Sequence, residues 1–192
     1  MKTTTYLFAL LIAVAGITVS CDQEKKSTEG DNVTIIPGDM ALEPTSVDYV
    51  NERLAIYAPF ELTADISHLS ENEKQIIGIL FEVAGIMDDL FWKQTIGQKD
   101  AFLERISDEN TKKFAMINYG PWDRLNNNTP FIAGIGEKPR GANFYPADMT
   151  KEEFEAFEDP GKTSLYTIIR RDENGSLKSV WYHEAYAAEL QK

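Results

Sequence analysis

The chain has 192 residues, of which 43% are hydrophobic and 26% are charged, and its formal net charge is -12. This size and composition predict one soluble domain with a sizeable hydrophobic core. A protein that binds nucleic acid needs a basic face, so the acidic balance argues against nucleic acid as a partner. The chain has only one Cys, which excludes a disulfide within it.

The first twenty residues have the pattern of a secretion signal. Lys2 precedes an apolar run over residues 6–19, which is too short and too closely followed by polar residues to be a membrane-spanning helix. The junction of Ser20 and Cys21 resembles the end of a bacterial lipoprotein signal. We therefore expect a signal peptide over 1–20, lipidation of Cys21 and a membrane-anchored lipoprotein of the bacterial cell envelope. An ordinary cleaved signal and a simple anchor are the alternatives.

Residues 21–46 are largely polar and contain Gly, Pro, Ser and Thr without a periodic pattern. This composition predicts a flexible tether between the lipid and a folded region over 47–192. A single acyl chain binds a membrane only marginally, so stable anchoring would take several chains on Cys21. A membrane is thus expected as a partner only through the N-terminal lipid.

Two helices are predicted in the first half of the folded region. A short one is expected over 47–57, because Pro59 stops it. A stronger one begins at Ser70, which can form a capping box with Glu73, and ends at Gly97, which suits a left-handed cap. Its apolar residues recur every three or four positions and make a face wide enough to predict a core helix: Ile76, Ile77, Leu80, Phe81, Val83, Ala84, Met87, Leu90 and Phe91.

Two pairs of residues within this helix need an explanation. Gly78 and Gly85 each cost about 1 kcal/mol relative to Ala in a helix interior, which predicts close approach by another element. Asp88 and Asp89 resemble a catalytic carboxylate pair, but adjacent helix residues point about 100° apart. We therefore assign the pair a structural role, with Asp89 bonded weakly to Lys93 one turn later.

Further short helices are expected over 99–106 and 109–117. In the first of these, Phe102, Leu103 and Ile106 share one face, so they should point inward.

The last part of the chain mixes helix and strand signals. Thr150 and Glu153 form a second capping box, and the helix that follows ends at residues 159–161, Asp-Pro-Gly. Residues 164–171 and 176–182 are rich in β-branched and aromatic types and flank an Asn-Gly turn, which predicts a β-hairpin. The fold class expected from all these elements is α+β.

Residues 183–192 contain strong helix formers and no stop signal. The chain thus ends inside a predicted helix, which suggests a fragment of something longer.

Residues 118–149 have neither a helical nor a strand period, and they carry four Gly, four Pro and several aromatic residues. An unstructured connection of this length is usually functional or disordered. Disordered segments are poor in aromatic residues, so we expect an ordered loop fixed by its aromatic side chains. Loops held by a scaffold often carry binding residues.

We expect Trp122 and Phe144 to point inward from this loop, because aromatic side chains gain by burial. The polar residues Asp123, Arg124 and Asn143 should turn toward a cleft. The candidate contacts to a substrate or partner are Trp122, Asp123, Arg124, Asn143 and Tyr145. The alternative, equally open, is that the loop only covers a core.

The C-terminal segment contains part of a zinc-binding motif but lacks one of its ligands. His183 and Glu184 begin like the H-E-x-x-H zinc helix, but Ala187 stands where the second His is needed. His68, the other His, is far away in sequence. No catalytic residue, metal ligand or cofactor is therefore expected in this chain.

The glycines of the loop do not make a nucleotide site. Pro139 follows Gly134 and Gly136 where a dinucleotide-binding helix would have to begin. Ala142 and Asn143 stand where a phosphate loop needs Lys and then Ser or Thr.

Three strings, NYGPWDRLNNNTPFIAGIGEKPRGANFYPADMTKEEFEAF, SLYTIIRRDENGSL and IMDDLFWKQ, resemble the N-terminal part of bacterial zinc hydrolases related to dipeptidyl peptidase III, the peptidase family M49. The resemblance covers roughly residues 55–192. It implies that the chain corresponds to a partial lobe of a two-lobed metallopeptidase. Members of that family hold zinc through an H-E-x-x-H-type helix and release dipeptides from peptide N-termini.

None of the family's zinc ligands can be assigned to a residue of this chain, since their motifs would lie downstream of Lys192. The same holds for the Glu and Tyr that help to hold the substrate. The resemblance therefore implies that the chain alone is inactive as a hydrolase. Two alternatives remain: a non-catalytic envelope lipoprotein that binds a peptide or protein partner through residues 118–149, and a truncated gene product without its own function.

Overall fold

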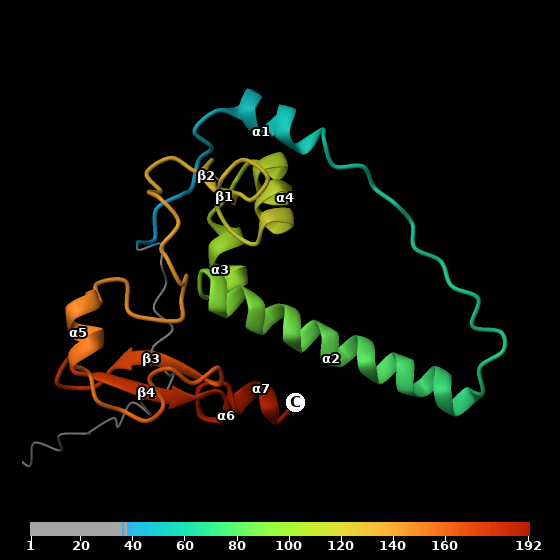
Figure 1. Ribbon diagram of the computed structural model, residues 1–192. Coiled ribbons are helices and arrows are strands. Elements are labelled where there is room, and N and C mark those ends of the chain that lie inside the picture. The colour runs from blue at the N-terminus through green and yellow to red at the C-terminus, as the bar shows by residue number, and fades with distance from the viewer. Residues whose placement is uncertain (1–35, 37) are drawn as a thin grey trace, which may run out of the picture.

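The computed structural model describes residue 36 and residues 38–192, in which helices are combined with two small antiparallel sheets (Figure 1). The α+β class predicted from the sequence is confirmed. The expected signal peptide over 1–20, Cys21 and most of the tether over 21–46 lie outside the described residues. Within the described part, no helix is both long enough and apolar enough to cross a membrane.

Three of the first four helices begin at side-chain caps that the sequence carries, and the third helix is the exception. The four helices are α1 (Val47–Leu54), α2 (Glu71–Thr95), α3 (Lys99–Glu104) and α4 (Glu109–Asn118). Ser46, Ser70 and Asp108 each accept a hydrogen bond from an amide in the first turn of α1, α2 and α4. At Ser70 the predicted capping box is complete, because the Glu73 carboxylate accepts from the Ser70 amide at 2.8 Å. Gly97 follows α2 with a φ of 113°, as expected for a left-handed cap.

The main hydrophobic core lies among α1, α3, α4, the C-terminal end of α2 and the loop after α4. Its buried members are Ile36, Leu42, Val50, Trp92, Ile96, Phe102, Ile106, Phe114, Ala115, Trp122, Phe131 and Ile132. The burial of Phe102 and Ile106 confirms the predicted inward face of α3, against which Leu103 also packs. Leu42 is buried as well, and its amide donates to the Arg105 carbonyl at 2.8 Å. The tether predicted over 21–46 therefore does not extend as far as Leu42.

Helix α2 reaches this core only with its last turn, where Trp92 and Thr95 are buried. The prediction of a core helix is wrong for the rest of it: Leu80 is 59% exposed and Phe81 is 75% exposed. Figure 1 shows α2 running away from the core toward the extended segment that joins it to α1. The apolar pattern indicates which face of the helix would favour burial. No segment among the described residues covers that face.

The expected close approach to Gly78 and Gly85 is also wrong within the described residues, since no atom lies within 4 Å of a Cβ built on either glycine. Asp88 has the structural role that we predicted. It accepts hydrogen bonds from Lys99 at 2.9 Å and from the Tyr119 hydroxyl at 2.7 Å. Its neighbour Asp89 is exposed and makes no ion pair with Lys93.

The predicted hairpin is present, with β3 (Thr167–Arg171) antiparallel to β4 (Leu177–Trp181) and Thr167 opposite Trp181. Its turn places Gly175 at a φ of 81°, which is why the Asn-Gly sequence is a good signal. A second, smaller pair joins β1 (Trp122–Asp123) to β2 (Thr129–Pro130) within the loop after α4.

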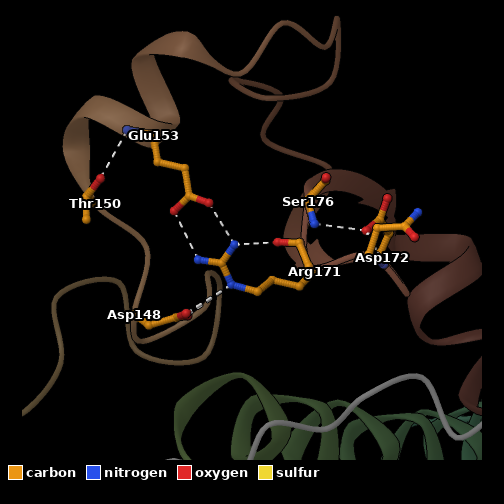
Figure 2. A network of polar contacts seen from close by, with 8 residues as sticks. Asp148, Thr150, Glu153, Arg171, Asp172 and Ser176 are labelled. Carbon is orange, nitrogen blue, oxygen red and sulfur yellow. Dashed lines mark hydrogen bonds and ion pairs between the residues drawn. The ribbon is translucent and has the colours of Figure 1, made fainter.

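Helix α5 (Lys151–Ala156) is tied to this hairpin by Arg171 (Figure 2). The guanidinium donates to Glu153 at 2.7 and 3.0 Å, to Asp148 at 3.0 Å and to the Gly175 carbonyl at 2.7 Å. Thr150 caps α5, accepting from the Glu153 amide at 3.1 Å. The Glu153 carboxylate, which forms the other half of the predicted capping box, also accepts from Arg171, and the hydrogen bonds from Arg171 are the main cause that lowers its pKa.

The chain ends in two short helices, α6 (Tyr182–Ala185) and α7 (Ala187–Leu190), where one helix over 183–192 was predicted. The break lies at Tyr186, which has a φ of -121° and a ψ of 31°. The Tyr186 side chain is buried, and Glu189 forms an ion pair with Lys93 of α2. The break in the helix therefore coincides with tertiary contacts, which helix propensity does not predict.

Candidate functional site

The loop over 118–149 is ordered around Trp122. Tyr119 ends α4 in the left-handed region, with a φ of 53°, and the chain then turns back toward the core. Trp122 is only 2% exposed, and its indole nitrogen donates to the Gly136 carbonyl at 3.0 Å. The prediction that Trp122 points inward is thus confirmed, and its hydrogen bond joins the two halves of the loop.

Asp123 does not turn toward a cleft, contrary to our prediction. Its side chain is fully buried and accepts from Arg53 Nε at 2.6 Å and from the Tyr49 hydroxyl at 2.9 Å, both in α1. Burial alone would raise the pKa of Asp123, but the hydrogen bonds from Arg53 and Tyr49 prevail and hold the pKa below its usual value. A buried carboxylate needs such partners, and no sequence pattern indicated that they would come from α1.

The same carboxylate shapes the turn that follows it. Its Oδ1 accepts from the Leu125 amide at 3.1 Å, and the Asp123 carbonyl accepts from the amides of Asn126 and Asn128. Asn127 and Asn128 both have positive φ, a conformation that Asn tolerates well. Asp123 is therefore a residue that positions its neighbours rather than one that contacts a ligand.

Asn143 is the second candidate that the structure assigns to the interior. Its side-chain amide donates to the Lys93 carbonyl at 2.7 Å, and its backbone amide donates to the Gln94 carbonyl at 3.0 Å. These bonds satisfy carbonyls that the end of α2 leaves unpaired. The next residue, Phe144, is half-buried and accepts from the Ile169 amide of β3 at 2.9 Å. Asn143 and Phe144 thus link α2 to the hairpin.

The structure shows why residue 141, two positions before Asn143, is a glycine. Its φ is 78°, and a Cβ at this position would lie 1.8 Å from the Tyr145 ring. Tyr145 covers this glycine on one side and is 40% exposed on the other. It borders a hollow of about 300 Å³ together with Phe154 and Leu165.

Arg124 is the candidate that faces solvent, and it has a cationic neighbour that the sequence did not suggest. Its guanidinium lies 5.9 Å from the centre of the Phe91 ring, and the Lys138 ammonium lies 5.9 Å from that of Trp122. Burial, and to a lesser extent the charge of Arg124, lowers the pKa of Lys138. Within residues 38–192, no carboxylate pairs with either cation. Together they can bind an anionic or carbonyl group.

The structure therefore divides the five predicted contact residues. Arg124 and Tyr145 are accessible, and Tyr145 borders the hollow of about 300 Å³, whereas Trp122, Asp123 and Asn143 support the loop from inside. The prediction of one polar cluster facing a cleft is wrong. Composition located the ordered loop, but it could not tell a buried polar residue from an exposed one.

A larger hollow of about 890 Å³ lies between the second half of α2 and the C-terminal segment. Its lining is mostly apolar and comes from Val83, Ile86, Met87, Leu90, Phe91, Tyr166, Trp181, Tyr182, Tyr186 and Leu190, with His183 among the polar residues. We call it the aromatic groove. Burial raises the pKa of Tyr182 and of Tyr186. Sequence analysis missed the groove, although the three aromatic residues at 181, 182 and 186 were a signal.

The described residues do not suit a zinc ion. His183 is exposed and its ring lies 6.5 Å from that of Trp181 in the groove, whereas His68 is exposed in the turn before Glu71. The groove begins at Val83, about 18 Å along the helix from Glu71. Among residues 38–192, no group of three or more His, Cys, Asp or Glu side chains could hold a metal.

Comparisons with known proteins connect this architecture to hydrolases. No protein-family model matches the chain. The chain is similar to Nudix hydrolase 3 of Arabidopsis thaliana, with 25% identity over 205 residues that cover 74% of the chain and 27% of the plant protein. In structure it is similar to dipeptidyl-peptidase III from Corallococcus sp. strain EGB, with a TM-score of 0.67 and 28% identity.

The structural match covers 77% of this chain but 30% of the Corallococcus chain. The chain thus spans about three tenths of the length of both relatives. The predicted relation to dipeptidyl-peptidase III is confirmed at the level of fold and sequence similarity.

Proposed function

We propose that this chain forms the N-terminal part of a dipeptidyl-peptidase III-like zinc peptidase of the M49 type and contributes substrate-facing surface, but not the zinc. The observation that carries the proposal is the similarity in structure to a dipeptidyl-peptidase III over 77% of the chain, at a TM-score of 0.67. The shared 28% identity supports a relation beyond fold alone. The match spans 30% of that enzyme, and the proposal assigns catalysis to the portion outside the match.

The chemistry of the side chains supports this division of roles. A catalytic zinc needs about three protein ligands at one point. His68 lies in the turn before α2, whereas His183 of α6 lines the groove beside the second half of α2, so the chain alone is expected to be inactive. Arg124 and Lys138 offer N–H donors to a peptide carbonyl or carboxylate at the surface of the ordered loop.

A chimeric enzyme tests the proposal. The portion of Corallococcus dipeptidyl-peptidase III that matches this chain is replaced by residues 47–192, and release of dipeptides from a peptide is measured. We expect zinc-dependent release by the chimera and none by the chain alone. Arg124→Ala in the chimera should raise KM more than it lowers kcat, whereas the control Lys178→Ala, an exposed cation on β4, should change neither. A folded, zinc-loaded chimera without activity would contradict the proposal.

Metal analysis of the purified chain is a separate test. After dialysis we expect no stoichiometric zinc, because too few ligands converge. One tightly held zinc per chain would contradict this expectation and direct attention to His68, His183 and Glu184.

A second candidate is a non-catalytic envelope lipoprotein that binds a peptide or protein through the loop over 118–149. The accessible cation pair of Arg124 and Lys138 favours it, since neither needs a zinc-bearing portion to bind an anionic group. This candidate requires lipidation at Cys21, so Cys21→Ser should abolish labelling by a fatty-acid analogue. Unchanged labelling in that variant would rule it out.

A further inference from the structure

Helix α2 presents an apolar face that the described residues leave open to solvent. Before Trp92 no residue of α2 is buried, and the exposed large side chains are Ile76, Ile79, Leu80, Phe81, Val83, Met87 and Phe91. A helix whose apolar residues extend over most of its circumference is normally buried. An exposed apolar surface of this extent marks a contact with something else.

Between Gln75 and Met87, the polar residues of α2 and its two glycines lie along a single line, the polar line. At about 100° per residue, Gln75, Gly78, Glu82, Gly85 and Asp89 fall on one side of the helix. The two glycines therefore lie on the polar line and leave the apolar sides to the larger residues. The contact that covers α2 must reach around both flanks of the helix while leaving this line in water.

The exposed face and the aromatic groove form one continuous surface. Val83, Met87 and Phe91 are exposed on α2 and also border the groove. From there the surface continues over Trp181, which is 42% exposed, and Leu190, which is 68% exposed. A single partner can therefore lie along α2 and enter the groove at its end.

We infer that this surface binds a polypeptide with the fold of the portion of dipeptidyl-peptidase III that has no counterpart in this chain. The chain superposes on that enzyme over 77% of its own length but spans 30% of the enzyme, so a protein of this architecture contains a large additional portion that can cover α2. The inference rests on the structural similarity and not on the proposed activity.

Charge argues against a second copy of the chain as the occupant. Each copy carries a formal net charge of -12, and exposed acidic residues border the surface at Glu82, Asp89 and Glu184. Two such surfaces would bring like charges together, which opposes association. A partner with apolar helices and basic residues at their edges is complementary.

Hydrogen exchange and light scattering on the full chain test the inference. The probe is the portion of Corallococcus dipeptidyl-peptidase III that this chain does not match, expressed separately and mixed with the chain. We expect a one-to-one complex and at least a tenfold slower amide exchange over residues 71–91. Leu80→Glu combined with Phe81→Glu should abolish both effects. The control pair Leu62→Glu and Leu165→Glu alters side chains that are 88% and 84% exposed and belong neither to α2 nor to the lining of the groove, so it should preserve both effects.

Three outcomes would overturn the inference. The first is unchanged exchange over 71–91 with no complex. The second is a homodimer of the chain alone that protects α2 equally well. The third is a complex that survives the Leu80 and Phe81 substitutions. Because the readouts are mass and exchange, an inactive chimera would refute the proposed function while leaving this inference intact.

Discussion

The two parts of α2 share apolar residues at helical spacing but have opposite surroundings. The last turn buries Trp92 at 2% exposure among Phe102, Ile96 and Tyr119, whereas Phe81 three turns earlier is 75% exposed. Both parts carry apolar residues at helical spacing, so local sequence does not distinguish them. An apolar stripe therefore indicates which face of a helix favours burial. Whether that face is buried depends on the segments that pack against it.

The largest expected effect separates these two parts directly. Trp92→Ala removes a fully packed indole and should cost about 3–5 kcal/mol of unfolding free energy. Phe81→Ala in the chain alone should stay within about ±0.5 kcal/mol, because its side chain is already in water. Chemical denaturation followed by circular dichroism measures both. A cost for Phe81→Ala equal to that for Trp92→Ala would show that α2 is covered in solution.

Substitution of Asp123 should give the next largest effect. It applies the same comparison of buried and exposed sites to charged groups. Asp123→Ala leaves Arg53 without its carboxylate in a partly buried position and should cost about 3–5 kcal/mol. Glu52→Ala removes an exposed carboxylate of α1, the helix that carries Arg53; it is the matched control and should be nearly neutral. Similar costs for the two variants would mean that the ion pair does not stabilise the fold.

The pH dependence of stability tests the same ion pair. The folded pKa of Asp123 is below its usual value, so the carboxylate contributes stability above about pH 4, the value for an unfolded Asp, and loses it as the pH falls through the folded pKa. Wild-type protein should therefore lose more unfolding free energy than Asp123→Asn as the pH is lowered below 4. Parallel losses in the two proteins would exclude this role for Asp123.

Gly141 should give an intermediate effect. Gly141→Ala places a Cβ 1.8 Å from the Tyr145 ring at a φ of 78°, so about 1–3 kcal/mol should be lost. Gly136→Ala is the control, because nothing lies within 4 Å of its Cβ position. Adding Tyr145→Ala to Gly141→Ala should recover the part of the loss that comes from the ring and leave the backbone strain. An unchanged melting curve for Gly141→Ala would show that the loop does not hold this geometry.

Arg124 should give the smallest effect on stability. Its guanidinium is exposed and the buried partner of Asp123 is Arg53, so Arg124→Ala should lie within about ±0.5 kcal/mol. Arg53→Ala should instead resemble Asp123→Ala, since it leaves a buried carboxylate uncompensated. The same denaturation experiment distinguishes the two arginines, and a large cost for Arg124→Ala would assign it a role in the fold.

Several elements could be predicted from the sequence because their causes are local. The Ser70–Glu73 capping box, the Gly97 cap and the Asn-Gly hairpin each depend on residues a few positions apart, and all three are present. The ordered loop and the inward Trp122 followed from composition, because aromatic residues gain from burial wherever the chain leads them.

The candidate site could be predicted only in part. Position in the loop was enough to single out Asp123 and Asn143, but the directions of their side chains depend on groups 70 and 50 residues away in sequence. Asp123 is held in the interior by its ion pair with Arg53 of α1. Asn143 is held there by the hydrogen bond from its side-chain amide to the Lys93 carbonyl. Such pairings join segments that no local pattern connects.

The sequence by itself determined the α+β class, most caps and turns, and the apolar character of α2, since each follows from backbone preference or from side-chain transfer out of water. Only the tertiary structure decided which apolar residues are covered, which polar ones are buried and where the last helix breaks at Tyr186. The physical reason is that burial requires two surfaces in contact. A local sequence pattern describes the apolar face of one element but not the element that packs against it.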